Sequence, residues 1–196
     1  MEVDTVVSGS PFFIGSQSEW FWAMAQAIIV ALSLLFIGQQ IRLQSHANVL
    51  TALAGIQHQW TSPELVYARG LTCAHWKDQG PFFENAEETV CTFFENLGLY
   101  VEKQVVSQEI AWELYSYYVE HYWAMLEREI RDIRKENEDP TLYCHFQRLN
   151  AILRDYGLRR GVVPGDFSPA RITRFRDYEL KRVAEFREFQ STLSRS

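Results

Sequence analysis

Residues Trp20–Ile41 read WFWAMAQAIIVALSLLFIGQQI, a run of 22 residues without a formal charge. At a rise of about 1.5 Å per residue, a helix of this length crosses a hydrocarbon core of roughly 30 Å. Trp20 and Trp22 stand at one end, where amphipathic rings prefer the level of the lipid headgroups. The run therefore predicts a transmembrane helix over residues 20–41.

The alternative interpretation of this run is a cleaved signal peptide, which begins with basic residues and has a shorter apolar region. Residues 1–19 contain no Lys or Arg, whereas Arg42, Arg69 and Lys77 all follow the run. Because basic residues accumulate on the cytoplasmic side, we expect residues 1–19 to be a short extracytoplasmic tail. The expected protein is single-pass, in a bacterial inner (plasma) membrane, with its N-terminus outside and its C-terminal domain in the cytoplasm.

One face of the predicted span carries small side chains. Ala23, Ala27 and Ala31 recur at a spacing of four residues, with Gln26 beside them. Small residues at this spacing let two membrane helices approach closely, and a polar amide can bond across such a contact. We expect the protein to form a homo-oligomer or to bind a partner membrane protein through this face, within the lipid bilayer.

Composition and charge narrow the class of the remaining chain. With 47% hydrophobic and 14% aromatic residues in 196, the chain suits one globular domain. Residues 42–153 carry nine basic and sixteen acidic residues, against ten and six in residues 154–196. The net charge of −6 disfavours nucleic-acid binding. Three cysteines without a Cys-x-x-Cys pair fit a reducing compartment.

The chain after the span shows helical periodicity and no sustained period-two alternation, which predicts an all-α protein. We expect a helical connector over 42–60, a cytoplasmic helical domain over 61–160 and a basic amphipathic helix within 161–196, about five helices after the span. The expected starts are Ser62-Pro63, running to about Lys77; Asn85, closed or bent by Gly98; Ser107, running to about Asn137; Asp139-Pro140, running to near Gly157; and Ser168-Pro169.

No sequence motif specifies a reaction. Phosphate-binding loops, the Gly-x-Ser-x-Gly elbow and His-Glu-x-x-His are absent, which disfavours the common nucleotide hydrolases and other hydrolytic enzymes. His121 lies on an apolar helical stripe and is either a buried base or, the interpretation we favour, a hydrogen-bonded core histidine. Cys73-x-His75, Cys144-His145 and Cys91 suggest a metal site by residue type but match no standard spacing. We expect no metal and no cofactor, with Cys73 and Cys91 as small buried residues and His75 as a donor at a helix end.

The basic final helix has two interpretations. It can meet anionic headgroups of the inner leaflet, or it can pack on the acidic part of the chain that precedes it. We favour the internal contact.

Three segments carry a family resemblance: Trp60-Thr61-Ser62-Pro63-Glu64 with Ala68-Arg69, Phe93-Phe94-Glu95-Asn96-Leu97-Gly98, and Tyr122-Trp123 with Arg134. They resemble an uncharacterised bacterial family of small membrane-anchored helical proteins, a domain of unknown function, over roughly residues 20–153. The resemblance implies the same architecture and brings no catalytic residue. If the shared positions are structural, Ser62-Pro63 caps a helix, Phe93 and Phe94 fill the core and Trp123 anchors the central helix. If they are functional, Arg69, Glu95 and Arg134 line a polar site, near which we also place His121.

We expect a noncatalytic, membrane-tethered interaction or sensor module, in stress or phage defence. One alternative is an oligomeric effector that permeabilises the membrane when its cytoplasmic domain is triggered, with Gln26, Ser33, Gln39 and Gln40 lining the opening. Another is an enzyme with an unfamiliar site around His121 and Glu95.

Overall fold

The computed structural model describes residues 19–78, 85–163, 165 and 167–193, so the expected tail 1–19 lies outside the described residues except for Glu19. These residues form α-helices and contain no strand, which confirms the all-α prediction. The helices are α1 Glu19–Trp60, α2 Pro63–Asp78, α3 Asn85–Glu102, α4 Gln108–Glu136, α5 Cys144–Arg159 and α6 Pro169–Leu193.

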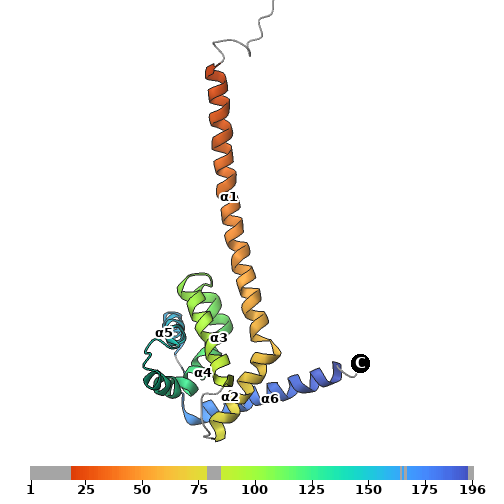
Figure 1. Cartoon of the computed structure of the whole chain (residues 1–196), viewed down its shortest axis with the longest axis vertical. Helices are drawn as coiled ribbons and strands as arrows, with labels where there is room; N and C mark the ends of the chain where they lie inside the picture. Colours follow the sequence, from red (N-terminus) through yellow and green to blue (C-terminus); the bar gives the residue numbers. More distant parts are fainter. Residues whose placement is uncertain (1–18, 79–84, 164, 166, 194–196) are drawn as a thin grey trace, which may run out of the picture. The chain divides into compact units, whose positions relative to one another are not determined.

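The chain divides into two compact units, Met1–Asn48 and Val49–Ser196, which we describe separately. In the first unit, the segment Trp20–Gln40 of α1 is 21 residues long and strongly apolar, and none of it is buried. It is long and apolar enough to span a membrane. Helix α1 is one element of 42 residues (Figure 1), which confirms that the apolar helix continues into the chain that follows it.

Serine caps and prolines set the starts of three helices, as the sequence predicts. The Ser62 hydroxyl accepts a hydrogen bond from the Leu65 backbone N–H at 3.3 Å, and the Ser107 hydroxyl accepts one from Ile110 at 3.2 Å. Each bond satisfies an amide that the first helical turn would leave without a partner. Helices α2 and α6 both begin at the proline that follows the serine.

The predicted start of α5 at Asp139-Pro140 is wrong, because the helix begins at Cys144. The Asp139 carboxylate accepts hydrogen bonds from the backbone N–H and the hydroxyl of Thr141, at 2.8 and 2.6 Å, and so closes a local turn. Tyr143 follows with a φ of 54°, a left-handed conformation that cannot continue a helix backwards. The aspartate here stabilises a turn instead of a helix start.

Gly98 and Gly157, expected at or near helix ends, lie inside their helices, whereas Gly161, with a φ of 78°, follows the last residues of α5. Helix α3 runs through Gly98 to Glu102, and α5 runs through Gly157 to Arg159. Gly98 serves packing instead, since a Cβ there would lie 2.3 Å from the His145 carbonyl oxygen. The α3 and α5 backbones touch at this point.

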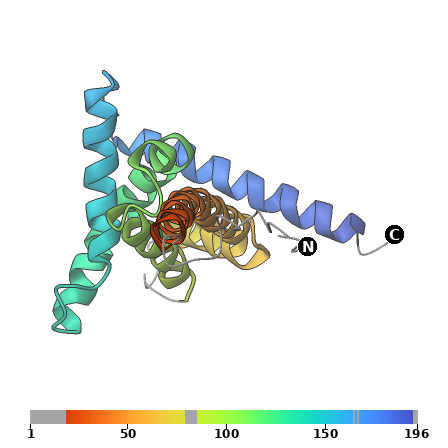
Figure 2. The ribbon, with the colours of Figure 1, turned by 90° about the horizontal axis from the view of Figure 1, so that it is seen from above.

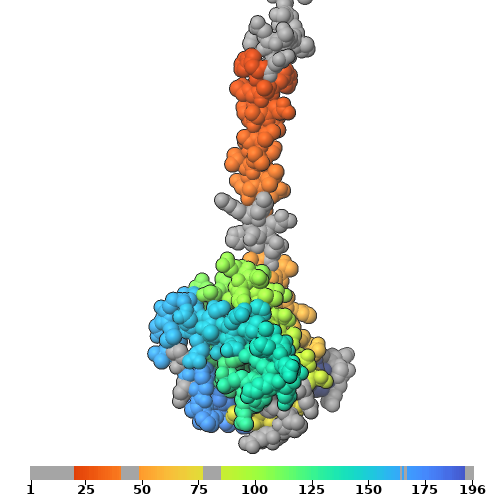
Figure 3. All heavy atoms as spheres, turned by 60° about the vertical axis from the view of Figure 1, so that its left-hand side comes forward, coloured from red at the N-terminus to blue at the C-terminus, as the bar shows by residue number. Residues whose placement is uncertain are grey.

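The second unit is built around an aromatic core. Helix α3 packs against α2 and α5, and α4 packs against α5. Atoms of α3, α4 and α5 lie next to one another on the face of this unit that Figure 3 shows. Phe94 stacks on Phe146 at 4.8 Å between ring centroids, and Trp60 lies 5.0 Å from Phe93. Trp123 meets the edge of Phe146 at 5.1 Å. The structural roles expected for Phe93, Phe94 and Trp123 are therefore confirmed.

Helix α6 packs against α2 and α4, and its C-terminal part extends past the other helices of this unit (Figure 2). Its buried stripe is Ile172, Phe175, Glu179 and Val183, whereas Phe189 of the expected apolar face is 62% exposed. The favoured internal contact of the final helix is thus present. It is apolar around one buried acid, and among the described residues no basic side chain of α6 forms a salt bridge with the preceding acidic part of the chain.

Candidate functional site

The buried stripe of α6 brings a carboxylate against an arginine of α2. Arg69 Nε lies 3.3 Å from Glu179 Oε2, and the two side chains are 1% and 0% exposed. Tyr122 of α4 donates its hydroxyl hydrogen bond to the same Glu179 oxygen at 3.0 Å. Three helices therefore meet at one carboxylate that water does not reach.

The Arg69 guanidinium is also held by an aromatic ring. Its Cζ stands 4.0 Å from the centre of the Trp60 ring, a cation–π contact. Next to it, a Cβ on Gly70 would come 2.8 Å from a Val183 methyl, so α2 and α6 are closely apposed here. Buried ions are tolerated only when they are paired, and this one is paired across two helices that are distant in sequence.

The polar groups of this cluster are incompletely satisfied. Arg69 Nη1, Thr72 Oγ1 and Glu179 Oε1 are buried and have no hydrogen-bond partner among the described residues. Such groups cost free energy relative to an apolar core. The cluster fixes where α6 lies, but it holds α6 less firmly than apolar packing of the same volume would.

The thiols of Cys73 and Cys91 are buried, as expected from the sequence. Burial raises the pKa of Cys73 to about 12, and Glu179 adds to this effect. Burial likewise raises the pKa of Cys91. Both remain protonated at neutral pH, which disfavours nucleophilic or metal-binding roles for them.

His121 is the hydrogen-bonded core histidine that we favoured. Its Nδ1 lies 2.6 Å from the Tyr117 carbonyl oxygen, which can only accept, so Nδ1 carries the proton. Arg171 Nε then donates to His121 Nε2 at 3.4 Å, and Phe175 stacks on the ring at 4.6 Å. Burial lowers the pKa of His121, and the hydrogen bond to Tyr117 opposes the shift. No free lone pair is left for a base.

Glu95 and Arg134 both hold the segment that leads into α5. Glu95 accepts a hydrogen bond from the Phe146 backbone N–H at 2.7 Å. Arg134 donates from Nε to the Leu142 carbonyl oxygen and from Nη1 to Gln147 Oε1, each at 2.8 Å. Because the N-cap Tyr143 offers no side-chain bond, Glu95 caps α5 from a neighbouring helix.

The structure thus separates the four residues of the predicted polar site into two pairs. Arg69 and His121 both contact α6, through Glu179 and through Arg171. Glu95 and Arg134 meet at the start of α5. The predicted association residues Ala23, Gln26, Ala27 and Ala31 belong to the first unit, where all four are exposed on α1.

One group of side chains among the described residues has the composition of a metal site. Glu95, Cys144 and His145 each place a ligand atom within 4.8 Å of one another. His145 Nδ1 lies 2.9 Å from Glu102 Oε1, and Arg148 lies 3.3 Å from the other oxygen of Glu102. Burial would raise the pKa of Glu102, but the bond from His145 and the Arg148 charge lower it. Glu102 is therefore a carboxylate that orients the imidazole.

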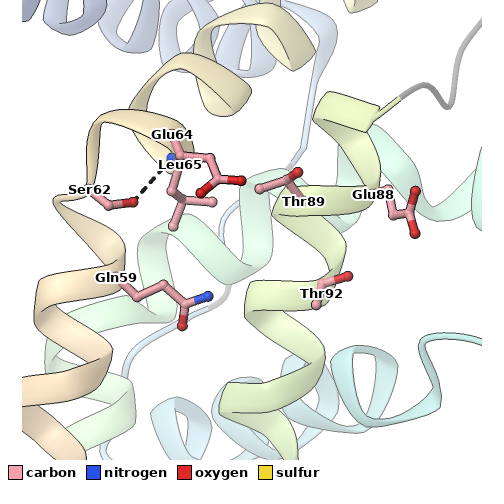
Figure 4. A pocket seen from close by; sticks show the side chains of 7 residues that line it. All are labelled: Gln59, Ser62, Glu64, Leu65, Glu88, Thr89 and Thr92. Carbon is pink, nitrogen blue, oxygen red and sulfur yellow. Dashed lines mark hydrogen bonds between the residues drawn. The ribbon is translucent and has the colours of Figure 1, made fainter.

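A hollow of about 280 Å³ opens between the start of α2 and the first turns of α3 (Figure 4). Seven residues line it, none of them basic, cysteine or histidine: Gln59, Ser62, Glu64, Leu65, Glu88, Thr89 and Thr92. One of its polar groups, the Ser62 hydroxyl, is engaged in capping α2. The lining offers hydrogen bonds and negative charge but no nucleophile–base pair.

Sequence reasoning missed Glu179 and the contact of Glu102 with His145. The signal for Glu179 was present, since it lies four residues from both Phe175 and Val183, at a core position of the final helix. A charge at such a position indicates a buried partner. Glu102 had no comparable signal, because its partner His145 lies 43 residues away and only the α3–α5 contact joins them.

A family model described as "Domain of unknown function (DUF4760)" matches residues 23–152, about two thirds of the chain. No curated protein and no solved structure matches the chain. The matched region includes Trp60, Arg69, Glu95 and Tyr122, whereas Glu179 and all of α6 follow it.

Proposed function

We propose, from the premise that the chain belongs to the DUF4760 family, that it is a noncatalytic membrane-tethered interaction or sensor module. The observation that carries the proposal is the segment Trp20–Gln40, which is apolar and long enough to span a bilayer and has no buried residue. Exposed apolar surface of this extent needs lipid or protein around it. The protein then lies in a bacterial inner membrane with its N-terminus outside and the unit from Val49 onward in the cytoplasm.

Self-association through the span is the second part of the proposal. Ala23, Ala27 and Ala31 are exposed on α1 and share one helical face with Gln26. Lipid tails are as apolar as the side chains they surround, so the hydrophobic effect does not drive membrane helices together. These helices associate instead through close packing, which small residues allow. This face suits a second copy of the chain or a partner membrane helix.

The sensing element of the proposal is α6. It lies outside the matched family region and packs on it through a buried ion pair with incompletely satisfied polar atoms. Such a contact has a defined position and a modest net free energy, as a reversible docking element requires. Release of α6 would uncover Arg69, Tyr122 and Phe175 for a partner.

The rival interpretations receive less support from the described residues. For a pore, the Ser33 hydroxyl is already used within α1, where it donates to the Ile29 carbonyl oxygen at 2.7 Å. For an enzyme, both ring nitrogens of His121 are engaged, so this histidine offers no base. Depolarisation of vesicles by the triggered protein would revive the first rival.

The test is the oligomeric state of the full chain in detergent micelles, measured by light scattering and by crosslinking in native membranes. Ala27→Leu should weaken the assembly, because the larger side chain separates the helices. Ala25→Leu is the matched control, since it adds the same bulk on the opposite face of α1. A wild-type monomer, or equal loss in both variants, would refute association through this face.

A further inference from the structure

The start of α5 and the facing side of α3 gather three donor types that transition metals prefer. Glu95 comes from α3, and Cys144 and His145 are the first two residues of α5. We propose that these three side chains form a binding site for a divalent transition metal, with Zn²⁺ as the ion that their chemistry fits best. From the sequence we expected no metal at Cys144-His145, because the spacing matches no standard site and Glu95 is 49 residues from Cys144.

The donor set is the first argument. Thiolate, imidazole and carboxylate together suit Zn²⁺, whereas Mg²⁺ and Ca²⁺ prefer oxygen alone. One thiolate and one carboxylate also balance the charge of a divalent ion. Binding replaces the Cys144 thiol proton, which leaves to solvent, with a bond from sulfur to the metal.

The spacing of the donors is the second argument. Ligand atoms around a tetrahedral Zn²⁺, with bonds of about 2.0 to 2.3 Å, lie roughly 3.3 to 3.8 Å apart. The three donors of this cluster already lie within 4.8 Å of one another. A movement of about 1 Å, within the reach of side-chain rotation, brings them to bonding distance.

The outer partner of His145 is the third argument. Its Nδ1 donates to the Glu102 carboxylate at 2.9 Å, so Nε2 is left with a lone pair. A carboxylate behind the imidazole is the usual arrangement at protein zinc sites, where it fixes the ring and increases its basicity. Arg148 in turn holds Glu102 at 3.3 Å.

The backbone also fixes the site. The Phe146 N–H donates to one Glu95 oxygen at 2.7 Å, which leaves the other Glu95 oxygen for a metal. Gly98 allows α3 to touch the His145 carbonyl, where any Cβ would collide. All three ligand side chains are partly exposed, so an ion has a path from solvent and a fourth position for water.

The competing explanation is that Glu95 serves only as a helix cap and that the thiol lies nearby without a role. The two explanations differ in whether Cys144 and His145 bind a metal ion. The experiment is a titration of the full chain in detergent with Co²⁺, followed by competition with Zn²⁺. Co²⁺ reports its own coordination through the thiolate charge-transfer band and the visible bands of a four-coordinate ion.

We expect one Co²⁺ per chain with a thiolate band, displaced by one equivalent of Zn²⁺. Cys144→Ser should abolish the band, and His145→Gln and Glu102→Gln should each weaken binding by about tenfold or more. The matched controls are Cys73→Ala and His58→Gln, which remove a buried thiol and an exposed imidazole elsewhere. Circular dichroism checks that each variant is folded, and if Cys144→Ser is not, His145→Gln decides.

A wild-type protein without the band, or a band that persists in both Cys144→Ser and His145→Gln, would overturn the proposal. Loss of the band in Cys73→Ala alone would overturn it as well. None of these outcomes bears on the oligomer test, which uses a different unit of the chain.

Discussion

Replacing Arg69 with methionine should release α6 from the rest of its unit. The variant keeps much of the length and apolar volume of the side chain, but it leaves the Glu179 carboxylate, which is 0% exposed, with only the more distant Arg182 Nη1 at 4.0 Å as a salt-bridge partner among the described residues. Breaking a buried pair by removing one partner costs about 3 to 5 kcal/mol, because the remaining charge is poorly solvated, and the residual contact with Arg182 places this variant toward the lower end of that range. The contact between the Arg69 guanidinium and Trp60 is lost as well.

Hydrogen exchange of the full chain, followed by mass spectrometry, measures this effect locally. At about 1.4 kcal/mol per tenfold, the α6 amides should exchange about two to three and a half decades faster than in the wild-type protein. Amides of α3, which contacts α2 and α5, serve as the internal reference. Arg174→Met, an exposed change on α6, should leave exchange unchanged.

The double variant Arg69→Met with Glu179→Met completes the test. It removes both charges, so α6 should regain most of its protection. Exchange within threefold of wild type in Arg69→Met would refute the reasoning. So would a double variant as unprotected as the single one, because the loss would then come from packing and not from the unpaired carboxylate.

Two further predictions follow from single positions. Gly98→Ala should lower the free energy of unfolding, measured by denaturant titration, by about 1 to 3 kcal/mol, because the added Cβ meets the His145 carbonyl. The control is Gly55→Ala, which has open space around it and should leave the free energy of unfolding unchanged or raise it. A Gly98→Ala variant as stable as wild type would contradict the α3–α5 contact. The pKa of His121 is lowered in the folded state, so the unfolded chain binds more protons and stability should fall as pH drops below about 6.5. His121→Gln should flatten that part of the plot of melting temperature against pH, with Arg171 still charged, and an unchanged slope would contradict a buried neutral imidazole.

The helix starts show what local sequence can predict. Ser62, Ser107 and Ser168 each precede a helix, because a serine oxygen and a following proline or acid satisfy the first turn without help from distant residues. The same logic failed at Asp139, whose carboxylate found the nearer amide of Thr141. Gly98 failed as an end signal because a neighbouring helix needed the space that its missing side chain leaves.

The candidate sites show where local sequence reasoning stops. The sequence analysis placed four polar residues in one site, Arg69, Glu95, His121 and Arg134. In the structure, Arg69 and His121 contact α6, whereas Glu95 and Arg134 contact the start of α5. Their partners outside their own helices lie 8 to 110 residues away along the chain, and no motif marks them. Residue type identified polar side chains worth attention, but not their partners.

Composition and helical periodicity are enough to predict the apolar span, the all-α class, most helix starts and the aromatic core. Each depends on composition or on periodicity within one helix, and these forces act over a few residues. The pairing of Glu179 with Arg69, and the position of Glu95 beside Cys144 and His145, could be learned only from the packing of the helices. Glu179 must be paired because it is buried, and Glu95 reaches Cys144 and His145 because α3 and α5 approach closely at Gly98. Both contacts depend on how helices distant in sequence fill space.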